Sequence, residues 1–105
     1  MNTQINKLIE DIKADYIGWS GIANLSSQKT IDEFRASVHY TEGQKYFKIS
    51  TRSSVWGFIV KEDGVKFRKG DILKAAGYNA PATNKARGNI IDGGYTIRWT
   101  GPLYL

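Results

Sequence analysis

The side chains that could carry catalysis are few in this chain. His39 is the single histidine and there is no cysteine, so thiolate nucleophiles and zinc-cysteine sites are excluded. Alternating polar and apolar residues place His39 on the solvent side of a predicted strand. The sequence does not indicate a serine and a carboxylate beside it that would form a catalytic triad. The acids match no calcium-loop spacing, and there is no glycine-rich nucleotide-binding motif. We therefore expect no enzyme activity, no cofactor and no bound metal.

The distribution of charge is the positive signal. The chain has 15 Lys and Arg residues against 10 Asp and Glu residues. Residues 1–33 hold three lysines against five acids, a net charge of −2, whereas residues 34–105 hold twelve basic residues against five acids, a net charge of +7. A basic body of this kind favours an acidic partner such as nucleic acid.

Cations and one aromatic ring are predicted on the solvent faces of two β-hairpins. Cations there would contact phosphate oxygens, and a tyrosine would stack on an unpaired base. The candidate nucleic-acid-binding residues are Arg35, Lys48, Arg52, Lys61, Lys66 and Arg68 for phosphate, and Tyr46 for stacking.

The first element that must position these residues is an amphipathic helix predicted over residues 3–17. Gly18 offers it a left-handed stop, and the polar residues and glycines of 18–33 are typical of a connection. Apolar residues recur at spacings of three and four residues, which places them on one stripe of this helix. They are Ile5, Leu8, Ile9, Ile12 and Tyr16.

Two hairpins follow in the prediction. From Phe34 to Thr41 apolar and polar residues alternate, which indicates a half-buried strand. A two-residue turn at 42–43 would set Val38 opposite Phe47 and His39 opposite Tyr46. The basic solvent face of this hairpin would then run from Arg35 to Arg52.

The second hairpin starts from a strand over residues 54–61. This segment is apolar on both faces and is therefore predicted to be central, with Gly57 marking a bulge or a close backbone contact. A type I′ turn at 63–64 would set Val60 opposite Phe67 and Lys61 opposite Lys66. A turn at 68–71 then leads into a strand at 72–76.

The last third of the chain is rich in turn residues. Pro81 and Gly88 fit the start and end of a short helix over 81–88, and Tyr95–Trp99 predicts a strand before a turn and Leu103–Leu105. Tyr78 has two interpretations: it plugs the core, which is the favoured one, or it belongs to a contact loop. The other members of that loop would be Asn79, Asn84, Lys85 and Arg87.

Length and composition fit one α+β domain over residues 1–105. We expect an N-terminal helix packed on a bent, mostly antiparallel sheet of five to seven short strands, with a barrel-like sheet as an alternative. No apolar run approaches the about 20 residues of a membrane span, and residues 1–12 lack a signal-peptide core. A cytoplasmic protein is therefore expected.

Six stretches in the second part of the chain occur in a recognisable order: GQKYFKI at 43–49, SVWGFIV at 54–60, KGDILKAA at 69–76, APA at 80–82, ARGNI at 86–90 and GGYTIRWTGPLYL at 93–105. Together they resemble small uncharacterised proteins of tailed bacteriophages. The resemblance covers residues 43–105 and implies phage origin and a location in the host cytoplasm. It brings no catalytic or binding residues with it.

Several interpretations of the cations remain open beside nucleic acid. The same charges would suit a module that binds an acidic surface of a host enzyme or defence factor, or a minor virion component. Lysines on strand edges also deter aggregation, and a charged sheet face is often only solvated.

Overall fold

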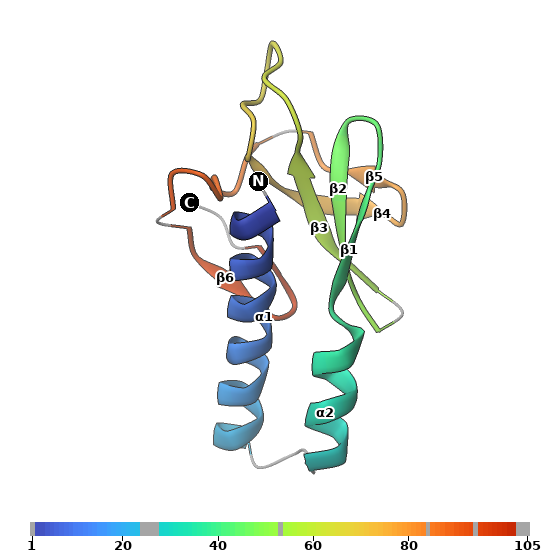
Figure 1. Ribbon diagram of the computed structural model, residues 1–105, viewed down its shortest axis with the longest axis vertical. Helices are drawn as coiled ribbons and strands as arrows, with labels where there is room; N and C mark the ends of the chain where they lie inside the picture. Colours follow the sequence, from blue (N-terminus) through green and yellow to red (C-terminus); the bar gives the residue numbers. More distant parts are fainter. Residues whose placement is uncertain (1, 24–27, 53, 84, 94, 103–105) are drawn as a thin grey trace.

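Two helices precede two antiparallel sheets in the computed structural model (Figure 1), which describes residues 2–23, 28–52, 54–83, 85–93 and 95–102. The predicted α+β class is confirmed. The helices are α1 (Asn2–Ala23) and α2 (Gln28–Ser37). None of the described helices is long and apolar enough to cross a membrane.

The main sheet is a meander in which each strand pairs with the next along the chain. Its order is β1-β2-β3-β4-β5, and over the described residues it does not close into a barrel. The strands are β1 (His39–Glu42), β2 (Tyr46–Thr51), β3 (Ser54–Val60), β4 (Ile72–Gly77) and β5 (Ala80–Pro81). The smaller sheet pairs β6 (Ile97–Arg98) with β7 (Gly101–Pro102).

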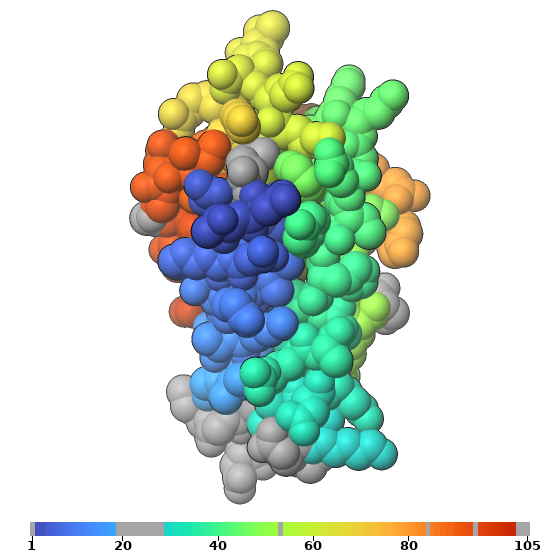
Figure 2. Space-filling view, in the orientation of Figure 1, coloured from blue at the N-terminus to red at the C-terminus, as the bar shows by residue number. Residues whose placement is uncertain are grey.

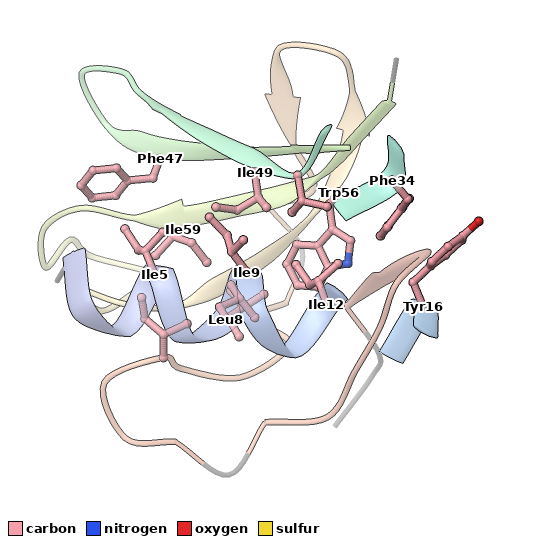
Figure 3. Packing of buried hydrophobic residues seen from close by; sticks show 13 residues of the cluster. Ile5, Leu8, Ile9, Ile12, Tyr16, Phe34, Phe47, Ile49, Trp56 and Ile59 are labelled. Carbon is pink, nitrogen blue, oxygen red and sulfur yellow. The ribbon is translucent and has the colours of Figure 1, made fainter. Parts of the chain in front are cut away.

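The main core lies between α1 and one face of this sheet. Figure 3 shows the side chains of α1 pointing towards those of β2 and β3. Ile5, Leu8 and Ile12 have no exposed surface, and neither do Ile49 and Ile59 on the strands. The apolar stripe predicted from the sequence is therefore the packing face of the helix, and each of these buried side chains contributes about 1.5–3 kcal/mol.

The prediction that α1 stops at Gly18 is wrong. The helix continues to Ala23, and a Cβ at Gly18 would meet nothing within 4 Å. Tyr16 stacks on Phe34 of α2, with ring centroids 3.9 Å apart. An interior glycine costs a helix only about 1 kcal/mol, and we infer that packing of α1 beside α2 offsets that cost.

The predicted connection over 18–33 and the predicted strand start at Phe34 are also wrong, because α2 occupies Gln28–Ser37. Residues 24–27 lie outside the described part. Phe34 and Val38 are buried and Ile31 is half-buried, whereas Ala36 is exposed. Phe34 and Val38 are four residues apart, and that spacing places them on one face in a helix as well as in a strand. Ala36 distinguishes the two structures, because a strand would bury it with Phe34 and Val38 and a helix does not.

The first hairpin forms with a different register from the one predicted. Glu42 lies opposite Phe47 and His39 opposite Ser50, so the pairing is shifted by four residues and the turn is longer. The Gly43 N–H donates to the Tyr46 carbonyl across it, at 2.9 Å. A shift by an even number keeps every side chain on its face, and the predicted burial of Phe47 and Ile49 is therefore confirmed.

Strand β3 is central and buried on both faces, as predicted. Ile49 pairs with Gly57 and Ser50 with Val55, so Trp56 is the extra residue of a β-bulge. A Cβ on Gly57 would lie 2.7 Å from the Leu73 carbonyl oxygen. Of the two alternatives predicted for Gly57, the close backbone contact is present at Gly57 itself, and the bulge lies at the neighbouring Trp56.

The second hairpin does not have the predicted register. Strand β3 ends at Val60, and residues 61–71 form a loop before β4, with Phe58 opposite Leu73. A hydrogen bond from Gly64 N to Phe67 O closes a turn inside the loop. Val60 therefore does not face Phe67, and Lys61 does not face Lys66. The turn at 68–71 is confirmed by the bond from Asp71 N to Arg68 O, at 3.0 Å.

The helix predicted over 81–88 is absent from the described residues of that segment. Ala80 and Pro81 pair with β4 instead, and the Arg87 amide donates to the Ile72 carbonyl at 2.7 Å. The two ends of the segment are therefore hydrogen-bonded to β4, at Ala82 and Arg87. The strand predicted at Tyr95–Trp99 is shorter, Gly101 and Pro102 form a strand instead of a turn, and Leu103–Leu105 lie outside the described residues.

Two glycine-to-alanine substitutions test this packing with opposite signs. Gly57→Ala forces a methyl group against a backbone oxygen, and we expect it to lower the free energy of unfolding by roughly 1–3 kcal/mol. Gly18→Ala adds a methyl group in open space inside a helix, and we expect it to raise that free energy by about 0.5–1 kcal/mol. Urea unfolding of both variants measures the change. A destabilising Gly18→Ala would contradict the continuation of α1.

Candidate nucleic-acid interface

The face of the main sheet that points away from α1 has a small core of its own. Phe58, Val60 and Leu73 are buried there, and Tyr46 and Phe67 are half-buried against them. Tyr46 meets Phe58 edge to face, with ring centroids 5.9 Å apart. We call this surface the open face, and its aromatic residues are fixed by packing.

Lys48 is the best positioned cation of the open face. It follows Phe47 on β2 and therefore points to the opposite side of the sheet. Its Nζ lies 4.1 Å from the centre of the Tyr78 ring and donates to Asn79 Oδ1 at 2.7 Å. Tyr78 is 67% exposed, so the interpretation that it plugs the core is wrong. Of the other members of the predicted contact loop, Arg87 is buried and Asn84 lies outside the described residues.

Two adjoining hollows share Tyr46 in their lining. The first, of about 350 Å³, lies between the β1-β2 turn and the loop 61–71, and it includes Val60, Lys66 and Phe67. The second, of about 230 Å³, includes Lys48, Phe58 and Asn79. Both hollows are also lined by Gln44, Lys45 and Tyr46. Figure 2 shows the loop 61–71, in yellow, beside the tip of the green β1-β2 hairpin at one end of the molecule.

Two of the predicted phosphate-binding residues are neutralised by carboxylates. Lys61 Nζ lies 2.6 Å from Glu42 Oε2 and also donates to the Gly43 carbonyl. Arg68 Nη2 lies 2.5 Å from Asp92 Oδ2, and this hydrogen bond and the charge of Asp92 raise the pKa of Arg68. Neither cation lies opposite Lys66 on a strand pair, so the sequence-based reason for choosing them does not hold.

Two others lie at the α2 end of the molecule. Arg35 is exposed in the last turn of α2. Arg52 has a positive φ of 29° in the β2-β3 turn, and its guanidinium lies 6.0 Å from the Phe34 ring and 3.5 Å from the Thr30 carbonyl. Of the seven predicted residues, four line the two hollows: Tyr46, Lys48, Lys61 and Lys66. Lys61 is the one of these four that is paired with a described carboxylate.

Sequence reasoning missed three residues of this surface: Lys45, Phe67 and Asn79. Lys45 and Phe67 were placed on predicted strands, whereas the structure puts one in the turn before β2 and the other in the loop 61–71. Asn79 was named as a member of the possible contact loop of Tyr78 but not among the candidate binding residues. The signal available for it was its position next to Tyr78 in a turn-forming stretch.

The loop 61–71 is anchored by a buried pair of polar side chains, Asp71 and Asn89. Asn89 Nδ2 donates to the Lys69 carbonyl and to Asp71 Oδ1, each at 2.9 Å. Asn89 Oδ1 accepts from the amides of Ile91 and Asp92, and Asp71 Oδ2 accepts from the amide of Arg68. These bonds fix the base of the loop that forms one wall of the first hollow.

Over the described part of the chain, no group of three or more His, Asp and Glu side chains could hold a metal ion. Comparisons of the whole chain with protein-family models, curated proteins and solved structures find no match. The function must therefore be argued from the open face itself.

The anchoring role of Asn89 can be tested by its removal. Asn89→Ala leaves buried amides and a carboxylate oxygen without their partner, and we expect the free energy of unfolding to fall by roughly 2–4 kcal/mol. Asn79→Ala is the matched control, because Asn79 is exposed, and we expect a change within about 0.5 kcal/mol. Urea unfolding measures both. Equal stability of the two variants would show that the pair does not anchor the loop.

Proposed function

We propose that this chain is a non-enzymatic nucleic-acid-binding protein that holds phosphates on the lysines of its open face, Lys45, Lys48 and Lys66. One observation carries the proposal. These three lysines line adjoining hollows around Tyr46, and none of them forms an ion pair with a described carboxylate. A cation without a carboxylate partner keeps its full charge for a ligand.

The carboxylates of the same region limit where a phosphate backbone can lie. Glu42, Glu62 and Asp63 also line the hollows. Glu42 is neutralised by Lys61, whereas Glu62 and Asp63 lie together beyond Val60 and would repel phosphate. The favourable path for a phosphate backbone therefore follows Lys66, Lys45 and Lys48 and avoids residues 62–63.

The resemblance of residues 43–105 to small phage proteins supports a setting in the host cytoplasm during infection, where nucleic acid is abundant. A protein partner with an acidic surface is the second candidate, because it would use the same lysines. Val65, which is fully exposed on the loop 61–71, favours it as an apolar contact for such a partner.

Two triple variants that lose the same charge test the proposal. Lys45, Lys48 and Lys66 are changed to Gln in one, and Lys29, Arg35 and Arg52, which lie at the α2 end, are changed to Gln in the other. We expect the first to lower affinity for a labelled oligonucleotide at least tenfold and to reduce the log-log salt slope by about 0.7–0.9 per lost phosphate contact. The second should bind nearly as the parent chain does. Fluorescence anisotropy over a salt series gives both quantities.

Other results would contradict the proposal in distinct ways. Equal losses in the two variants would mean that only net charge matters and that the open face is not the site. A flat salt response, or no binding of any nucleic acid at low salt, would exclude phosphate binding altogether. A protein partner retained from host lysate after nuclease treatment would then favour the second candidate.

A further inference from the structure

Three aromatic side chains lie along the open face. Phe67, from the loop 61–71, and Tyr46, from β2, both line the first hollow. Tyr78 lies beyond the second hollow, over Lys48 and next to Asn79. We call Phe67, Tyr46 and Tyr78 the aromatic strip.

A lysine accompanies each ring of the aromatic strip. Lys66 Nζ lies 5.6 Å from the Phe67 ring centre, and Lys48 Nζ lies 4.1 Å from that of Tyr78. Lys45 directly precedes Tyr46 and lines both hollows with it. Rings alternating with cations are the arrangement by which proteins bind an unpaired strand, because bases stack on the rings while phosphates lie on the cations.

The burial of the aromatic rings favours a single-stranded ligand over a double-stranded one. Tyr46 and Phe67 are half-buried at the sides of hollows and do not project from the surface. A duplex presents phosphates outside and keeps its bases stacked inside, so it could reach the lysines but not these rings. An unpaired base can turn into a hollow and stack there.

We infer, on the premise of the proposed function, that the aromatic strip binds a single strand of nucleic acid. The two hollows take unpaired bases, one on each side of Tyr46, and the phosphates between them lie on Lys66, Lys45 and Lys48. Tyr78 stacks on a further base at the end of the strip. Base identity is not selected by stacking, because every base has a π-face.

The first test compares three ligands of equal length, about 12 nucleotides or base pairs: a single strand, its duplex, and a strand of abasic sugar-phosphate units. The abasic strand has the phosphates but nothing to stack. Fluorescence anisotropy at low salt should show the single strand bound about 5- to 100-fold more tightly than the abasic strand, and more tightly than the duplex.

The second test separates stacking from charge with variants. Tyr78→Leu removes a ring that is 67% exposed, so the fold should not change, and we expect affinity for the single strand to fall about 5- to 100-fold with an unchanged salt slope. Tyr78→Phe is the matched control and should bind as the parent chain does. Tyr46→Leu and Tyr46→Phe repeat the comparison at the hollows, with urea unfolding to confirm that each is folded.

The outcomes distinguish this inference from the proposed function. Equal affinity for the single strand, the duplex and the abasic strand would overturn the single-strand inference while phosphate binding stands. Full binding by both leucine variants would overturn it as well. Loss of binding to all three ligands would remove both the inference and the function on which it rests.

Discussion

The packing of α1 against the sheet is the contact on which the rest of the structure depends. Its apolar stripe covers one face of β2 and β3, where Ile5, Leu8 and Ile12 are fully buried. The polar side of the same helix holds the C-terminal segment: Tyr95 Oη donates to Asp11 Oδ2 and the Trp99 amide donates to Asp15 Oδ2, each at 2.8 Å. One helix therefore holds together parts of the chain that are 84 residues apart.

Because α1 and α2 occupy one side, the sheet leaves its other side to smaller elements. There Phe58, Val60 and Leu73 need cover, which the half-buried Tyr46 and Phe67 provide. The same rings line the hollows at the surface. Their double role, as cover for a small core and as lining of a surface, keeps the proposed binding residues in place without a ligand.

Tertiary pairing divides the cations into two groups. Lys61 and Arg68 form surface ion pairs with Glu42 and Asp92, so each has a carboxylate partner within the chain. Lys45, Lys48 and Lys66 have no such carboxylate among the described residues, and the nearest polar partner of Lys48 is the neutral amide of Asn79. The proposed function rests on this division together with the hollows around Tyr46, which are lined by all three of these lysines.

The sequence by itself determined the α+β class, the stripe of α1, the central position of β3 and the burial of Phe47 and Ile49, because these depend on periodicities that local backbone geometry imposes. It did not determine that α1 continues past Gly18 or that Phe34 lies on a helix. A spacing of four residues fits the period of a helix and that of a strand, and the packing of Tyr16 on Phe34 favours the two helices. Turn lengths and ion-pair partners were likewise settled only in three dimensions. The candidate site changed most for this reason: which cations keep their charge depends on contacts between residues far apart in the chain, such as Arg68 and Asp92.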